Sequence, residues 1–258
     1  MNLLRKKLEN GESVIGTNSH LNCKGAVEII AASGFDFVFL DAEHPTAYPE
    51  ELYDLVKVCK YSGCTSLVRL PTLDLTYTKK VLDMGAEAVL FSMIRNAEDA
   101  KNATDMCLYP PYGKRGFGPM SAVRWGLDSE KEYVDNCITD TVRMIQIEQI
   151  SAAKDLKNIV KNEYIDAYLF GLNDFAASMG HIMDIYNPEV TKEIKSAINI
   201  LKDNGKIFGF IAGRVEKKEI EEWRDLGARV FSLGADFVYL REGVKTAFQT
   251  MKCEVKSK

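Results

Sequence analysis

The chain alternates between short apolar runs and longer segments in which apolar residues recur every three or four positions. The short runs are rich in β-branched and aromatic residues and predict strands. They lie at 13–18, 35–41, 65–70, 87–93, 141–147, 165–171, 206–211 and 228–233. The longer segments predict helices. They lie at about 23–33, 48–62, 75–84, 97–107, 151–162, 188–204, 215–226 and 241–252.

Eight strands, each followed by a helix, predict an α/β fold with a parallel sheet covered by helices. Eight such units in about 250 residues fit a closed (β/α)₈ TIM barrel better than an open doubly wound sheet. No glycine fingerprint follows the first strand, which disfavours a dinucleotide-binding fold. No linker divides the chain, so we expect a single domain over residues 1–258.

One connection is irregular. Residues 108–140, which begin "LYPPYGKRGFGPMSAVRWG", are too long and too rich in Gly, Pro and aromatic residues for a simple connector. A long loop in a compact domain is usually functional. We therefore expect this segment to pack over the site or at a subunit contact.

Composition excludes several classes of partner. The net charge is −4 and the basic residues are spread along the chain, so we expect neither a nucleic-acid nor a membrane partner. We find no apolar run of about 18 residues, as a membrane-spanning helix requires, and no apolar core of a secretory signal at the N-terminus. The six cysteines form no CxxC pair and are predicted to be reduced, which favours the cytoplasm.

Candidate chemistry gathers at the carboxyl ends of the predicted strands, where TIM barrels place their reacting groups. The charged and amide side chains found there are Asp41, Glu43, His44, Arg69, Gln146, Glu148, Asn173 and Asp174. No lysine ends any predicted strand, which disfavours a Schiff-base mechanism. Glycines follow the seventh and eighth strands, where many barrels bind phosphate, but such glycines also serve as turns.

Glu148 and Asp174 follow consecutive strands, so their carboxylates are expected to converge at the barrel mouth. Two like charges in a cleft raise each other's pKa unless a cation intervenes, and Mg²⁺ typically takes one or two protein carboxylates. The alternative is that both are ordinary polar residues at helix starts, with Asp174 as a cap. Spacing alone leaves both interpretations open.

Two further positions have a structural and a functional interpretation. Arg69 lies within an apolar strand and needs an anionic partner, either a protein carboxylate or a ligand. His44 follows Asp41 by three residues, and Asp41 is expected to orient its imidazole as a general base requires. A purely structural histidine is the alternative. His20 and His181 are weaker candidates for the same role.

Taken together, these stretches resemble the class II, metal-dependent pyruvate aldolases of the HpcH/HpaI aldolase family, which includes 4-hydroxy-2-oxoheptanedioate aldolase and 2-dehydro-3-deoxyglucarate aldolase. The resemblance covers nearly the whole chain. The motifs that carry it are "GFDFVFLDAEH", "VRLP", "KKVLDMGAEAVLFSMIRNAEDA", "YPPYGKRGFG", "QIEQ" and "GLNDFAASMG". It implies a barrel of the phosphoenolpyruvate/pyruvate type that cleaves a 4-hydroxy-2-ketoacid to pyruvate and an aldehyde.

The resemblance also implies a cofactor and roles for the metal and reacting residues. Glu148 and Asp174 would bind a divalent ion, Mg²⁺ or Mn²⁺ with Co²⁺ as a further option, and no nucleotide cofactor is expected. Arg69 would stabilise the enolate oxygen. His44, oriented by Asp41, would move protons.

For the substrate, the resemblance implies a second set of contacts. Gln146 would lie near the pyruvate, whose carboxylate would be held by backbone amides around Gly171, Leu172 and Asn173. Arg115 is a candidate for an acidic substrate group.

The resemblance further implies an assembly. Asp83 would approach a neighbouring subunit's site. Family members are commonly hexamers that exchange the C-terminal helix, so we expect a homo-oligomer with the helix at about 241–252 exchanged.

The chain departs from the family pattern at three places. It reads "GTNSHLN" where the family often has Trp, Ser92 where Pro is common, and "GLNDFA" where "GPADLS" is common. The proposed metal and proton-transfer residues are intact. The departures therefore bear on the aldehyde partner and the preferred ketoacid.

Rival functions remain at this point. A related lyase acting on acyl-CoA thioesters, of the citramalyl- or malyl-CoA type, would use a similar pair of carboxylates but needs a nucleotide-binding surface. An epimerase or isomerase would use a phosphate site at the glycines after the seventh and eighth strands. A non-catalytic barrel that only binds or scaffolds would more readily lack one of the candidate residues.

Overall fold

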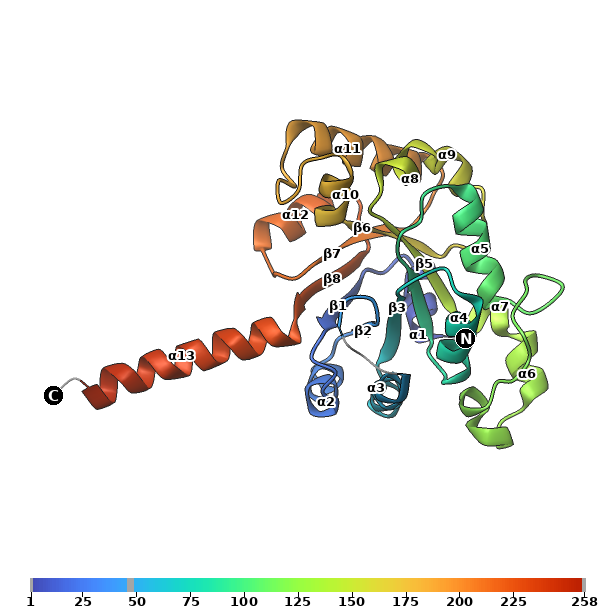
Figure 1. The fold of residues 1–258 in the computed structure, drawn as a ribbon, viewed down its shortest axis with the longest axis horizontal. Coiled ribbons are helices and arrows are strands. Elements are labelled where there is room, and N and C mark those ends of the chain that lie inside the picture. The colour runs from blue at the N-terminus through green and yellow to red at the C-terminus, as the bar shows by residue number, and fades with distance from the viewer. Residues whose placement is uncertain (1, 46–48, 257–258) are drawn as a thin grey trace.

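The computed structural model describes residues 2–45 and 49–256. Within them, eight parallel strands form a closed barrel in chain order, with the last strand paired to the first (Figure 1). They are β1 (Val14–Ser19), β2 (Phe37–Asp41), β3 (Thr65–Leu70), β4 (Ala88–Phe91), β5 (Val142–Ile147), β6 (Ala167–Gly171), β7 (Phe208–Ala212) and β8 (Val230–Ala235). The predicted barrel is confirmed, with every strand boundary within two residues of its prediction.

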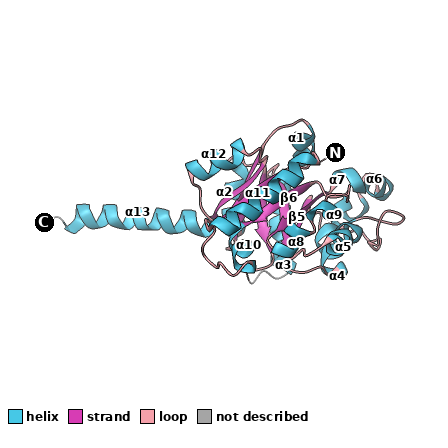
Figure 2. Ribbon diagram, turned by 90° about the horizontal axis from the view of Figure 1, so that it is seen from above, coloured by secondary structure: helices cyan, strands magenta, loops and turns pink. Residues whose placement is uncertain are grey.

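Helices surround the barrel (Figure 2). They are α1 (Leu3–Glu9), α2 (Lys24–Ala32), α3 (Pro49–Tyr61), α4 (Leu75–Asp83), α5 (Ala97–Cys107), the 3₁₀ helix η1 (Ser121–Gly126), α6 (Glu130–Asp135), α7 (Cys137–Asp140), α8 (Ile150–Lys154), α9 (Leu156–Ile159), α10 (Leu172–Ser178), α11 (Pro188–Asp203), α12 (Lys217–Asp225) and α13 (Asp236–Lys256). The single helix expected at 151–162 is two short ones, α8 and α9. The structure adds α1 and α10, which the pattern did not predict, and η1, α6 and α7 within the long connection.

Strand alternation divides the apolar residues between two cores. In β2, Phe37 and Phe39 point into the barrel, whereas Val38 and Leu40 pack outward against the helices. Successive side chains of a strand point to opposite faces, so residues two apart share an environment. Asp41 therefore follows the two inward phenylalanines and faces the inside of the barrel mouth.

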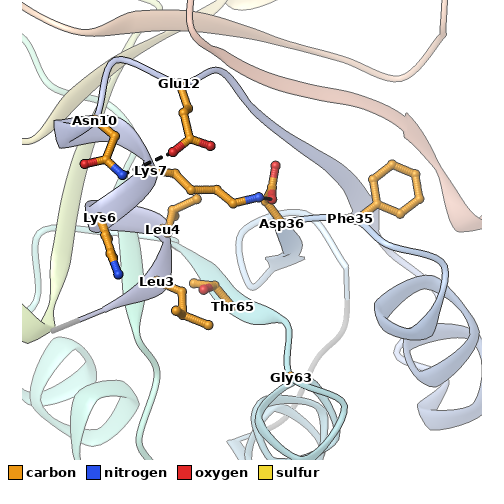
Figure 3. Close-up of a pocket in the computed structure, with 10 residues that line it drawn as sticks. All are labelled: Leu3, Leu4, Lys6, Lys7, Asn10, Glu12, Phe35, Asp36, Gly63 and Thr65. Carbon is orange, nitrogen blue, oxygen red and sulfur yellow. Dashed lines mark hydrogen bonds and ion pairs between the residues drawn. The ribbon is translucent and has the colours of Figure 1, made fainter.

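The amino-terminal end of the barrel is closed by α1. Asn2 caps this helix by accepting hydrogen bonds from the amides of Leu4 and Arg5, and Leu4 and Leu8 belong to the core inside the barrel. A cavity of about 300 Å³ lies beside α1 at this end and includes the Lys7–Asp36 ion pair (Figure 3). It lies at the starts of β2 and β3 and so is remote from the strand ends that carry the candidate chemistry.

The last helix differs from its prediction in length and position. It begins at Asp236 and runs to Lys256, and beyond its first turns it extends away from the barrel in both views (Figures 1 and 2). Apolar side chains recur along it every three or four residues and are 38 to 76% exposed. They are Phe237, Leu240, Val244, Phe248, Met251 and Val255. Among the described residues no helix has both the length and the apolar character needed to cross a membrane.

Candidate active site

The mouth of the barrel carries a buried ion pair between neighbouring strands. Register pairs Asp41 of β2 with Arg69 of β3. The Arg69 guanidinium donates from Nε to Asp41 Oδ1 at 2.9 Å and from Nη2 to Asp41 Oδ2 at 2.6 Å. Its Nη1 lies 2.9 Å from Glu43 Oε2. Such a two-pronged pair fixes both side chains in position.

Arg69 was expected to have either a protein carboxylate or a ligand as its anionic partner. Within this chain its partners are the carboxylates of Asp41 and Glu43. Burial disfavours the charged form of Asp41, but hydrogen bonds from His20 and Arg69 outweigh it and hold its pKa well below the usual range. Asp41 is therefore an ionised carboxylate in the interior of the mouth.

The histidine that contacts Asp41 is not the expected one. His20, just beyond β1, places Nδ1 3.1 Å from Asp41 Oδ2. His44 has a side chain that is 67% exposed, and its Nε2 is 3.9 Å from Glu43 Oε2. The prediction that Asp41 orients His44 is wrong, because the Asp41 carboxylate is bound by Arg69 and His20 instead. The catalytic role expected of His44 stays a prediction.

A second polar group lies at the end of β5. Glu148 is buried; its Oε1 accepts a hydrogen bond from the amide of Met93 and its Oε2 accepts one from Gln146 Nε2, both at 2.5 Å. Met93, which follows β4, has a φ of +56°, a conformation rarely adopted by non-glycine residues and common at functional sites. Gln146 Oε1 is buried without a hydrogen-bond partner among the described residues. Two side chains two residues apart thus face the same mouth.

Gly171, the last residue of β6, is required by this arrangement. A Cβ at this position would lie 2.4 Å from Gln146 Nε2 and 3.3 Å from Glu148 Cβ. It precedes α10, whose N-terminus has no side-chain cap. The backbone amides around Gly171, Leu172 and Asn173 are the predicted contacts of the pyruvate carboxylate, and that role stays a prediction. The Leu172 side chain is buried in the outer core, whereas Asn173 is exposed.

The surroundings of Glu148 hold too little positive charge to keep its pKa at the ordinary value. Burial, together with the negative charges of Glu43 and Asp174, raises its pKa to about 7, although the Met93 amide and Arg69 oppose the rise. Asp174 lies in the first turn of α10 and is exposed. The negative charge of Asp174 therefore reaches Glu148, whereas the shared metal site predicted for the two carboxylates stays a prediction.

These residues fit a divalent cation held by two carboxylates. Within residues 2–45 and 49–256 no group of three or more His, Cys, Asp or Glu side chains is placed to hold a metal ion. Mg²⁺ needs only one or two protein carboxylates, because substrate and water complete its shell. The raised pKa of Glu148 and the unused Gln146 Oε1 are the features that such an ion and its ligand would use.

Arg115 is a correction. Its side chain is buried, donates to Asp83 Oδ1 at 2.7 Å and lies over the rings of Tyr109 and Tyr133. The expected contact with an acidic substrate group is wrong, because the guanidinium is 1% exposed and fastens the long connection to the end of α4. The approach of Asp83 to a neighbouring subunit stays a prediction.

Three residues of the site carried little or no signal in the sequence. His20 was only a weaker candidate, and Met93 contributes through its backbone. Asp236 accepts hydrogen bonds from Ser19 Oγ and from the amides of His20 and Leu21, and so fixes the chain after β1. For these three residues the one signal in the sequence was that His20 lies next to the end of a predicted strand.

The comparisons with known proteins show the family of this chain. The family model described as HpcH/HpaI aldolase/citrate lyase matches residues 18–242. The chain belongs to this family. The family resemblance inferred from the motifs is thereby confirmed.

Several proteins similar to this chain are named as aldolases. A 4-hydroxy-2-oxovalerate aldolase of Rhodococcus jostii is 31% identical over 239 residues, covering 92% of this chain and 88% of that protein. A hydroxypyruvate/pyruvate aldolase of Roseobacter denitrificans is 27% identical over 240 residues, with 93% of each covered. The crystal structure of an HpcH/HpaI aldolase from Desulfitobacterium hafniense superimposes with a TM-score of 0.90 at 28% identity, covering 98% of this chain and 97% of that one. The expected enzyme class, an aldolase-type carbon–carbon lyase, is confirmed.

Proposed function

We propose that this HpcH/HpaI family member is a divalent-metal-dependent aldolase that cleaves a 4-hydroxy-2-ketoacid to pyruvate and an aldehyde. The observation that carries the proposal is the uncompensated carboxylate of Glu148, buried at the mouth with Gln146 beside it, Asp174 nearby and Arg69 contributing positive charge. The names of the aligned relatives, a 4-hydroxy-2-oxovalerate aldolase among them, support the substrate class.

Glu148 and Asp174 would hold the ion, for which Mg²⁺, Mn²⁺ and Co²⁺ are the candidates. When bound, it acts as a Lewis acid that stabilises negative charge on the ketoacid oxygens. A bound cation would also offset the burial and the nearby negative charges that raise the pKa of Glu148. Cation binding would therefore explain why Glu148 and Asp174 lack a compensating positive charge within the described part of the chain.

The protein's own residues supply the rest. Arg69, locked by Asp41 and Glu43, keeps a fixed positive charge at the mouth, where an enolate would develop after the carbon–carbon bond breaks. Gln146 is buried with Oε1 unused, so it can orient a substrate group. The uncapped amides at the start of α10 would hold the pyruvate carboxylate.

Assembly is part of the proposal. We propose that α13 packs against a second copy of the chain, in a homo-oligomer that exchanges this helix as family hexamers do. The apolar side chains along α13 supply the contact, because a helix with such a face needs a partner surface to bury it. The cytoplasm remains the proposed compartment.

The function is tested by a coupled pyruvate-release assay over a panel of 4-hydroxy-2-ketoacids, with and without divalent ions. We expect EDTA to abolish release and Mn²⁺ or Mg²⁺ to restore it. Full activity in the metal-free protein would contradict the metal site. Absence of pyruvate release from every member of the panel would contradict the substrate class.

Assembly has its own test, in which light scattering measures the mass of the wild type and of Leu240→Asp. A charge on the apolar face of α13 is expected to dissociate the oligomer. A wild-type protein that runs as a monomer would contradict the proposal.

A further inference from the structure

We propose that Ser92 is a positioning residue of the metal site, because it holds the backbone amide of Met93 against Glu148. The inference deepens the proposed function and rests on its assignment of Glu148 as a metal ligand. It begins in "FSMIRN", the stretch that ends β4, where this chain has a serine and the family pattern commonly has a proline. The serine supplies a hydroxyl group that proline lacks.

The Ser92 side chain is bonded to the neighbouring strand. It is 1% exposed, and its Oγ donates to the backbone carbonyl of Leu70 at 3.0 Å. Leu70 is the last residue of β3 and is paired in the sheet with Phe91, the residue before Ser92. The hydroxyl therefore extends the contact between β3 and β4 by one residue beyond the last pair of the sheet register.

The next residue, Met93, has a backbone conformation that needs support from its surroundings. Its φ of +56° lies in the left-handed region, where the Cβ of an L-residue comes too close to the following carbonyl oxygen. Such a conformation persists only where the surrounding structure fixes it. The Ser92 bond to Leu70 fixes the chain immediately before Met93, and Gln149 Nε2 contacts Met93 Sδ at 3.6 Å.

The Met93 amide and Gln146 together orient the Glu148 carboxylate. The amide donates to Oε1 and Gln146 Nε2 donates to Oε2. Both donors are uncharged, so they fix the carboxylate without taking the place of a cation. Each carboxylate oxygen has two acceptor positions, and one on each remains for a ligand. Loss of a group that orients a metal ligand usually costs 10- to 100-fold in metal affinity or activity.

The Ser92 hydroxyl thus acts on the metal site through residues that follow it in the chain. Without the bond to Leu70, Met93 can relax to a negative φ, which turns its amide away from Glu148. The carboxylate would then be free to rotate, and it would bind an ion less tightly. Glycine in place of Met93 would oppose this change, because glycine adopts a positive φ without a steric penalty.

The binding test compares Ser92→Ala, which deletes the hydroxyl, with Ser92→Thr, which keeps it. A double variant, Ser92→Ala with Met93→Gly, keeps the amide and allows a positive φ without the Leu70 bond. Thr104→Val is the control, because Thr104 is also 1% exposed and donates to a backbone carbonyl at 3.0 Å but belongs to α5. We measure the Kd for Mn²⁺ by calorimetry and the thermal midpoint of the metal-free protein.

We expect Ser92→Ala to raise the Kd for Mn²⁺ by about tenfold or more, as the loss of an orienting group does. Ser92→Thr and the double variant should bind within about threefold of wild type. Thr104→Val should lower the thermal midpoint and leave the Kd unchanged. A Ser92→Ala protein that binds within about threefold of wild type overturns the inference, as does a double variant that binds no more tightly than Ser92→Ala.

The second test needs neither metal nor turnover. The chain has nine methionines, so ¹⁵N-methionine labelling gives a simple NMR spectrum of backbone amides, in which Met93→Gly identifies the Met93 signal. In the metal-free protein at pH 8, Ser92→Ala should raise the rate at which the Met93 amide exchanges with D₂O by at least about tenfold. Thr104→Val should not change that rate.

An unchanged exchange rate in Ser92→Ala would overturn the inference, because the amide would then be held without the hydroxyl. The two proposals can fail separately. If the wild type neither binds Mn²⁺ nor releases pyruvate in its presence, the proposed function fails. The exchange rates would still decide whether Ser92 holds the Met93 amide.

Discussion

The two sides of the barrel mouth differ in how their charges are balanced. At the ends of β2 and β3, Asp41 and Glu43 are both bonded to Arg69, and hydrogen bonds keep Asp41 ionised despite its burial. At the ends of β5 and β6, Glu148 has no cation in hydrogen-bond contact among the described residues, and its pKa is raised to about 7.

At the ends of β2 and β3 the charges are balanced by residues of this chain. At the ends of β5 and β6 the charge of Glu148 needs a bound cation to balance it. Removing one partner of a buried carboxylate–arginine pair destabilises the fold, because the other charge is left buried without compensation. A buried carboxylate without a cation opposes folding and strengthens cation binding, because the ion removes the cost. Neutralising each side should therefore change stability in opposite directions.

The largest expected effect is on the paired side. Arg69→Met should destabilise the protein by about 3–5 kcal/mol, because Asp41 would be left buried without its main cation. The free energy of unfolding from urea titration measures it. Arg224→Met removes a pair with Asp225 in which both side chains are exposed and is the control, for which we expect a much smaller change. Equal losses in the two variants would remove the contrast between buried and exposed pairs.

On the unpaired side, Glu148→Gln should stabilise the metal-free protein at pH 8 by up to roughly 3 kcal/mol, since each unit of pKa shift corresponds to about 1.4 kcal/mol. The carboxyl is protonated in both states below its ordinary pKa of 4.5 and ionised in both above about 7. The wild type therefore loses stability as pH rises from 4.5 to 7, and the gain from glutamine should vanish at pH 4.

Glu163→Gln, at an exposed loop position, is the matched control for that measurement. It should leave the pH dependence of unfolding as in the wild type. A Glu148→Gln protein that is less stable than wild type at pH 8 would show that Glu148 is already compensated within the fold.

Metal affinity should follow the same titration. Because the proton and the cation compete for Glu148, the Kd for Mn²⁺ should rise about tenfold for each pH unit below 7 and level off above it. Calorimetric titration between pH 5.5 and 8.5 measures this dependence. A Kd that is constant across that range would show that a proton on Glu148 does not compete with the ion.

The smallest expected effect concerns the space around Gln146. Gly171→Ala places a Cβ 2.4 Å from Gln146 Nε2 and must displace that side chain, so we expect KM for the ketoacid to rise about tenfold, or about 1.4 kcal/mol. Gly213→Ala, whose added Cβ would meet nothing within 4 Å, is the control. Unchanged KM in Gly171→Ala would mean that Gln146 does not orient the substrate.

Much of this architecture follows from the sequence alone. The apolar runs specified the eight strands, because a strand buried on both faces needs nearly continuous apolar residues. The period of two in "FDFVFLD" also determined that Asp41 lies on the inward side with Phe37 and Phe39. Sequence analysis identified Arg69, Gln146 and Glu148 because they are polar residues at the ends of buried strands.

The tertiary structure decided which of these groups meet. Nothing local to Asp41 indicates that its imidazole partner lies just after β1, because this contact forms only when β1 and β2 pair side by side in the sheet. The burial of Arg115 against Asp83 likewise depends on how the long connection returns to α4. Sequence patterns determine which way a side chain points from its own strand or helix, whereas its partners depend on the elements that packing brings beside it.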